Sequence, residues 1–237
     1  PIFLLTFTVL SFASFNSQVR YMAFTMDHEG AYEGVLIRDR NWSELNMPTL
    51  DYARSHFERD ALVVPRNWYM AFDDEQKKYI EVERDDRVVR ATGLLGLTPE
   101  ESEVSAIDQA LVAGSFFSAD DVDACLISQE VADFLGIEVD GVGSEKVQIF
   151  GRELVVRGIF SAEDFEAVRD LDNEPLTPAD FQMSSAQALG PDAVDDMTME
   201  VSESALDVKP FIHLDAENIV VLPYNTLRGS GGTLRSV

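Results

Sequence analysis

Few residues in this chain have the type and spacing that catalysis or metal binding needs. His28, His56 and His213 lie far apart, and none belongs to an H-E-x-x-H or similar ligand pattern. We therefore expect them to be structural or surface residues. The sequence has no G-x-S-x-G motif for a serine nucleophile. Cys125 lies in the apolar run 124–128, which favours a small buried hydrophobic residue over a reactive thiol.

Two acidic clusters have the oxygen ligands that a hard cation such as calcium prefers. They are Asp120, Asp121 and Asp123, and Asp192, Asp195 and Asp196. Neither matches a calcium-binding loop of the D-x-[DN]-x-[DN]-G type, so we expect solvated loops at both. The glycine-rich run 229–232 lacks the Lys-Ser/Thr of a phosphate-binding loop. The sequence thus gives no catalytic residue, no cofactor site and no metal site.

Composition indicates a folded, strongly acidic protein. The chain has 237 residues, a hydrophobic content of 46% and a formal charge of −25. A chain of this length and apolar content can bury a core. A charge of −25 repels phosphate backbones, and no basic patch opposes it, so we expect no nucleic-acid partner. The single cysteine excludes an intrachain disulfide.

The negative charge is concentrated in the middle of the chain. Residues 91–208 contain 26 acidic and only four basic residues, whereas the two flanks together hold 17 acidic and 14 basic ones. Such a shift suggests an acidic unit inserted into a nearly neutral one. The alternative is a bias toward acidic residues on every exposed face.

Apolar runs and turn residues predict the elements that position these side chains. We expect strands at 32–38, 61–65, 67–72, 78–84, 87–97, 124–128, 146–150, 153–160 and 219–223. Helices are expected to start near Met47, with Pro48 in the first turn, at Gln129, which Gly136 would close, and after the N-cap Ser161. This alternation is typical of an α+β fold.

The amino-terminal run 2–15 carries no charge. As a helix it would be about 21 Å long, short of the roughly 20 residues that cross a bilayer. The run is either the end of a transmembrane helix or a buried strand. An abrupt start inside it suggests a fragment of a longer protein.

One stretch resembles a known family. Residues 113–121 (AGSFFSADD), 124–137 (ACLISQEVADFLGI), Gly143 and 154–160 (LVVRGIF) resemble the extracytoplasmic, periplasmic core domain of MacB/FtsX/LolC-type ABC transporter permeases. Residues 219–227 (IVVLPYNTL) resemble a later strand and helix of that family. Ser115 departs from the pattern, because the family usually has Arg at this position.

The resemblance implies a fold and a division of the chain. It implies an α+β fold of two lobes, with a mostly β lobe inserted into a porter-like α+β lobe. Residues 20–92 and 219–237 would form the porter-like lobe, residues 93–218 the inserted acidic lobe, and residues 1–19 the end of a transmembrane helix or a first strand.

The resemblance also implies a function outside the cytoplasm and without catalysis. A separate cytoplasmic ATPase subunit would hydrolyse ATP, and this domain would pass the motion to an export substrate, an accessory protein or a second permease copy. Candidate partner contacts are the aromatic residues Trp42, Trp68 and Tyr69, with core positions as the alternative for each of them. One alternative is a stand-alone secreted or cell-surface acidic binding module. Another is a hydrolase, which would need a deep cleft containing a carboxyl group of raised pKa.

Overall fold

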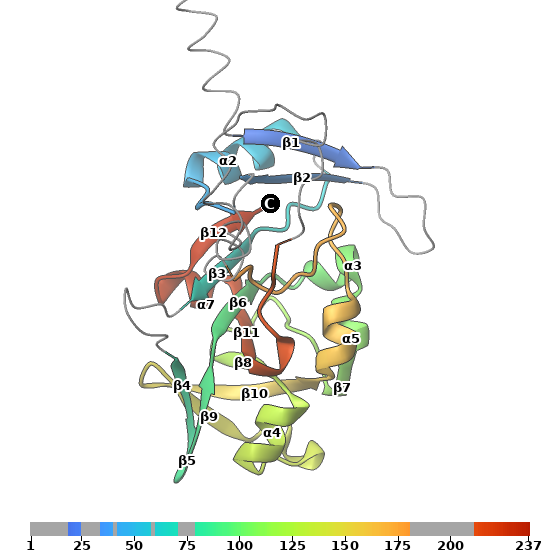
Figure 1. Cartoon of the computed structure of the whole chain (residues 1–237). Helices are drawn as coiled ribbons and strands as arrows, with labels where there is room; N and C mark the ends of the chain where they lie inside the picture. The colour runs from blue at the N-terminus through green and yellow to red at the C-terminus, as the bar shows by residue number, and fades with distance from the viewer. Residues whose placement is uncertain (1–18, 25–33, 40–41, 58–59, 71–78, 181–210) are drawn as a thin grey trace, which may run out of the picture.

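Twelve strands form one sheet with few helices around it in a computed structural model (Figure 1). The structure describes residues 19–24, 34–39, 42–57, 60–70, 79–180 and 211–237. The strands are β1 (Val19–Phe24), β2 (Gly34–Asp39), β3 (Arg66–Met70), β4 (Ile80–Arg84), β5 (Arg87–Ala91), β6 (Gly93–Leu97), β7 (Leu111–Gly114), β8 (Ala124–Ser128), β9 (Lys146–Ile149), β10 (Arg152–Phe160), β11 (Ile219–Pro223) and β12 (Thr233–Ser236). Their order is β1-β2-β12-β3-β6-β11-β8-β10-β9-β4-β5, with β7 beside β10. The described chain therefore has the expected mixed α/β character.

The helices are short, and most begin at a capped residue. They are α2 (Met47–His56), α3 (Glu101–Ser105), α4 (Gln129–Leu135), α5 (Ala162–Ala167) and α7 (Tyr224–Gly229), with 3₁₀ turns η1 (Ile107–Ala110), η2 (Val139–Gly141) and η4 (Ala216–Asn218). Asn46, Ser128 and Ser161 accept hydrogen bonds from the first turns of α2, α4 and α5. Gly136 ends α4 in the left-handed region with φ 69°. The predicted starts of all three helices are confirmed.

The first and last described strands lie on either side of β2 at one end of the sheet. β2 pairs antiparallel with β1 on one side and with β12 on the other. β12 also pairs antiparallel with β3, where Thr233 lies opposite Trp68. Segments from the two ends of the chain are thus held together through β2 (Figure 1).

The centre of the sheet is apolar on both faces. All five residues of β6, β8 and β11 are buried. Successive residues of β11 alternate between two core clusters, so that Val220 and Leu222 join one cluster and Ile219 and Val221 join the other. Helix α4 packs on the first face, and Phe165 of α5 lies in the cluster on the second. Continuous apolar strands are what a sheet covered on both faces requires.

The far end of the sheet is built on the nine-residue β10, which pairs with β7, β8 and β9. β4 and β5 continue the sheet beyond β9. The predicted strand 87–97 is divided at Thr92, whose backbone N–H donates to Asn218 O at 2.7 Å. The predicted strand 61–65 is wrong, because β3 starts only at Arg66. Pro65 has no N–H for a strand ladder.

Strands from the two predicted lobes alternate within the one sheet. β6, from the acidic middle of the chain, lies between β3 and β11, and β4 and β5 lie at the opposite end from β3. The division into two lobes stays a prediction. The run 2–15 and the cluster Asp192, Asp195 and Asp196 lie outside the described residues. Among the described helices, none is long and apolar enough to cross a membrane.

Candidate functional site

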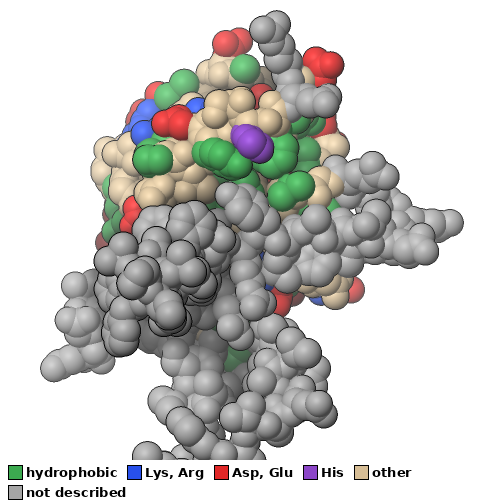
Figure 2. All heavy atoms as spheres, turned by 90° about the horizontal axis from the view of Figure 1, so that it is seen from above, with side chains coloured by type: hydrophobic (Ala, Val, Ile, Leu, Met, Phe, Trp, Pro, Cys, Tyr) green, Lys and Arg blue, Asp and Glu red, His purple; other side chains and the backbone are tan. Residues whose placement is uncertain are grey.

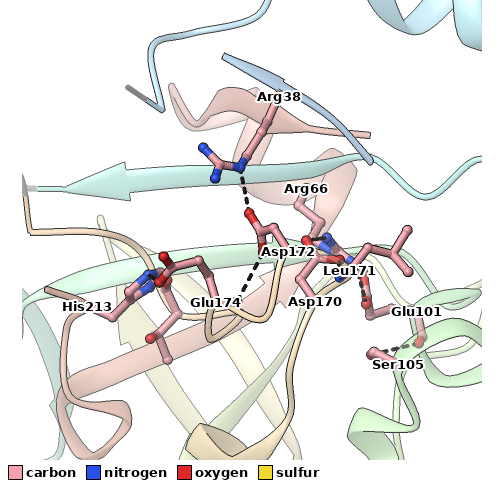
Figure 3. A network of polar contacts seen from close by, with 10 residues as sticks. Arg38, Arg66, Glu101, Ser105, Asp170, Leu171, Asp172, Glu174 and His213 are labelled. Carbon is pink, nitrogen blue, oxygen red and sulfur yellow. Dashed lines mark hydrogen bonds and ion pairs between the residues drawn. The ribbon is translucent and has the colours of Figure 1, made fainter. Parts of the chain in front are cut away.

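A buried ion-pair network joins β3 to two distant parts of the chain (Figure 3). Arg66 Nε donates to Glu101 Oε2 at 2.8 Å, and Nη2 donates to Oε1 at 3.1 Å. Arg66 Nη1 donates to Asp170 Oδ2 at 2.5 Å. The three side chains are 5%, 0% and 3% exposed. Because Arg66 is the shared ion-pair partner of both buried carboxylates, this triad fixes α3 and residue 170 against β3.

A second ion pair holds the segment that follows Asp170 to β2. Arg38 Nε donates to Asp172 Oδ2 at 2.6 Å. Burial raises the pKa of the Asp172 carboxyl, and the nearby Asp170 carboxylate adds to the rise, against the opposing effect of Arg38. The Arg38 guanidinium also lies 4.4 Å from the ring centre of Trp42.

His213 completes the attachment of residues 170–177. Its Nε2 lies 3.1 Å from Glu174 Oε2, and its Nδ1 contacts Thr177 O. The segment is thus tied by polar contacts to β2, to β3 and to the chain before η4. His213 has the structural role that the sequence predicts.

An apolar cavity of about 430 Å³ lies beside the network, between β2, the segment before β3, α3 and Leu171. Asp60, Arg66, Glu103 and Asp170 contribute its charged lining. This end of the molecule exposes Val35, Tyr52 and Leu62, which are 38%, 42% and 50% exposed. In Figure 2, which views the molecule from above, hydrophobic side chains gather on the described surface beside a histidine.

Within the described residues, the geometry at this cavity does not assemble an acid/base pair. Asp172, the carboxyl group with the raised pKa, is not among the residues that line the cavity, and it is paired with Arg38. Asp170 lines the cavity, but its two oxygens already accept bonds from Arg66 and from the Leu171 N–H. The arrangement is suited to holding elements together.

Of the three predicted contact residues, Trp42 and Trp68 lie together in one core cluster, whereas Tyr69 packs against the other cluster. Trp42 and Trp68 are each 2% exposed, so both occupy the core positions that the sequence left open as an alternative. Their ring centres lie 4.6 Å apart, and both belong to one core cluster. Tyr69 is partly buried, with its ring 5.2 Å from that of the 52% exposed Phe150. A role of these residues in partner binding stays a prediction.

The other candidates from the sequence are also placed. Cys125 is fully buried, and burial raises the pKa of its thiol far above the ordinary value. In the first acidic cluster, Asp121 accepts bonds from Ser118, and Asp123 pairs with Arg152 at 2.5 Å. Among the described residues no group of His, Cys, Asp and Glu is arranged to hold a metal ion.

Sequence reasoning missed the ion-pair network. Its signal was an arginine within an otherwise apolar strand, as at Arg38 in β2 and at Arg66 after the run 61–65. Such an arginine needs a buried carboxylate partner. The partner could not be identified, since 104 residues separate Arg66 from Asp170.

Comparisons with known proteins give structural neighbours only. No protein-family model matches the chain, and no curated protein matches it. The fold is similar to the periplasmic region of MacB from Actinobacillus actinomycetemcomitans, with a TM-score of 0.45 and 12% identity over 82% of this chain and 64% of that one. It is also similar to the extracellular domain of the noncanonic ABC-type transporter YknZ from Gram-positive bacteria, with a TM-score of 0.43 and 12% identity over 92% of this chain and 81% of that one. The chain thus spans slightly less than two thirds of the length of the first structure.

Proposed function

We propose that this chain is the extracytoplasmic domain of an ABC transporter permease subunit and transmits ATP-driven motion to an export substrate or accessory protein. A separate cytoplasmic ATPase subunit hydrolyses the ATP, and a second permease copy is the nearest partner. The domain itself is not an enzyme in this proposal. The transporter-like motifs of the sequence support it, because they form a contiguous β8, α4, β9 and β10 unit and the β11–α7 pair.

The observation that carries the proposal is the position of the first and last described strands. β1 and β12 flank β2 at one end of a sheet that continues to β5 at the other. A displacement of either end strand therefore acts on the whole sheet. Transmission of motion needs such a connected body, together with a surface for a partner.

The buried network is the second support. A domain that passes on motion must not deform locally where the motion enters. Arg38 ties β2 to Asp172, and Arg66 ties β3 to Asp170. β2 itself pairs with β1 and β12, the first and last described strands. Packed interiors with fixed ion pairs transmit strain because they are not continuously deformable.

A distance measurement in the full-length protein tests the transmission. Phe134 is 59% exposed on α4, far along the sheet from β2. One spin label at Phe134→Cys in each permease copy, with Cys125→Ala as background, reports the separation of the two copies. We expect this separation to change between the nucleotide-free and the ATP-bound transporter in membrane vesicles. The same separation in both states would contradict the proposed transmission.

A further inference from the structure

His213 lies between two oxygen atoms in the interior (Figure 3). Its Nδ1 lies 2.5 Å from Thr177 O, and its Nε2 lies 3.1 Å from Glu174 Oε2. The side chains of His213 and Glu174 are only 7% and 14% exposed. A ring rotated by 180° would place carbon atoms at both contacts, so the two oxygens define the orientation of the ring.

The two contacts require one proton more than a neutral imidazole and a carboxylate hold together. A carbonyl oxygen can only accept a hydrogen bond, so Nδ1 carries a hydrogen. A neutral imidazole then has a lone pair at Nε2, and the ionised Glu174 carboxylate also has only lone pairs to offer. Two buried acceptors that face each other repel and have lost their solvation. The contact between Nε2 and Glu174 is therefore made only when an additional proton lies on the ring or on the carboxyl group.

This contact lies beside a backbone bridge between two segments that are distant in sequence. Two backbone hydrogen bonds, with N–O distances of 2.6 and 2.8 Å, join residues 178–180 to residues 212–214. His213 lies in the middle of the second segment, and both of its oxygen partners lie just before the first. Arg66 holds the same part of the chain at Asp170, a few residues earlier. Loss of the additional proton would therefore loosen the chain at His213 while it stays fixed at Asp170.

The charged groups around His213 leave Glu174 as its one ionic partner within the described part of the chain. The ring contacts residues 174–179 and Trp42, whose ring centre lies 6.4 Å away. The charged residues on these elements, beside them in the chain or bound to Trp42 are Asp170, Asp172, Glu174, Asp180, Asp215, Arg38 and Arg235. Arg38 pairs with Asp172, and Arg235 donates to Trp42 O. Neither guanidinium is paired with Glu174, so the additional proton is what holds this carboxyl group to the ring.

From this geometry we infer that Glu174, Thr177 and His213 form a pH-sensitive clip. With the additional proton, the clip holds residues 174–177 to residues 212–214. When the pH rises and this proton is lost, the contact between Nε2 and Glu174 becomes repulsive and the clip opens. The inference does not depend on the transporter proposal, since it concerns a contact within this chain.

Hydrogen exchange in the full-length protein tests the inference. Peptides that cover residues 174–180 and 211–216 report the two sides of the clip. Their protection is compared at about pH 5.5 and about pH 8.5, on either side of the ordinary imidazole value of about 6.5, with labelling times scaled to the intrinsic exchange rate at each pH. We expect protection to fall about tenfold at the higher pH, because a charge-assisted hydrogen bond is lost. Equal protection at both pH values would overturn the inference.

Conservative variants identify the groups that titrate. Glu174→Gln supplies a side-chain N–H to the neutral ring, so its clip should stay closed at both pH values and its protection should change less than about twofold. Glu153→Gln is the matched control, because it removes a carboxylate from the exposed Lys146–Glu153 pair and should keep the response of about tenfold. Far-ultraviolet circular dichroism confirms that both variants are folded.

Two results with the Glu174→Gln variant would overturn the inference. The same response as in the wild type would assign the titration to another group such as Asp172, which is unchanged in this variant. A folded variant that is unprotected at both pH values would show that Glu174 holds His213 by charge alone.

Discussion

Arg66 and Glu101 form a two-point ion pair in the interior, with N–O distances of 2.8 and 3.1 Å and side chains that are 5% and 0% exposed. The pair joins β3 to α3 across 35 residues of sequence. A guanidinium held by two parallel bonds has one orientation, and this orientation also places Nη1 on Asp170. Arg66 is therefore the common anchor of three separate segments.

Replacement of Arg66 should destabilise the protein strongly. Arg66→Met would remove the charge that pairs with the buried Glu101 and Asp170 carboxylates, and we expect a loss of about 3–5 kcal/mol in the free energy of unfolding. Urea denaturation measures this loss. Lys146→Met is the control, because the Lys146–Glu153 pair is 54% and 69% exposed and should contribute less than about 1 kcal/mol. Similar losses in the two variants would contradict the anchoring role of Arg66.

Asp172 should make stability fall as the pH rises. Burial and the Asp170 carboxylate raise its pKa above the ordinary value of 3.8, so in the folded protein it keeps a proton that the unfolded chain has lost. Its stabilising contribution is complete below that ordinary value and is lost as the pH rises through the raised pKa. The stability of the wild type relative to Asp172→Asn should therefore decline from about pH 4 upward.

Asp121 serves as a control, because its effect on stability should change with pH in the opposite direction. Partial burial raises its pKa, but the bonds from Ser118 and the charge of Arg157 outweigh this effect and lower it overall. The stability of the wild type relative to Asp121→Asn should rise with pH over the acidic range. Urea denaturation at a series of pH values measures both differences. A difference for Asp172 that also rises with pH would show that the Arg38 ion pair dominates its titration.

Alanine substitutions at Gly114 and Gly151 should distinguish the cost of backbone strain from the cost of a steric clash. Both have positive φ, 79° and 74°. A Cβ at Gly151 meets nothing within 4 Å, so Gly151→Ala should cost about 1–2 kcal/mol from strain alone. At Gly114 a Cβ would lie 2.2 Å from the carbonyl oxygen of Arg157, and Gly114→Ala should lose about 1–3 kcal/mol more. Equal thermal shifts of the two variants would mean that β7 does not approach β10 so closely.

Cys125 should not react with thiol reagents in the folded protein. It is fully buried, and burial raises the pKa of the thiol, so almost no thiolate is present at neutral pH. We expect a maleimide to label it only after urea unfolds the chain. Rapid labelling without urea would show that the β8 region opens easily.

Local signals were sufficient to predict the strand, helix and hairpin between residues 124 and 160. Ser128 supplies an N-cap oxygen and Gly136 a left-handed C-cap, and both effects act within a few residues. The order of the strands was not predictable in this way, because the pairings of β12 with β2 and of β4 with β9 depend on the whole chain.

The candidate site was less predictable than the fold. Arg38 and Asp172 are 134 residues apart, and in a chain rich in carboxylates nothing local identifies which one is buried. The choice between a core position and a contact surface for Trp42 and Trp68 stayed open for a related reason. The side chain of each is buried by the other and by segments distant in sequence, and aromatic character alone does not distinguish a core position from a contact surface.

Labelling of a single introduced cysteine tests the proposed location most directly. Val139→Cys places a thiol at a position that is 62% exposed, while Cys125 is buried and provides no competing site. In the full-length protein, with cysteines elsewhere removed, a membrane-impermeant maleimide is added to cells whose cytoplasmic membrane is sealed. An extracytoplasmic domain predicts labelling from outside at the rate seen after lysis. Labelling that occurs only after lysis would contradict the proposed function.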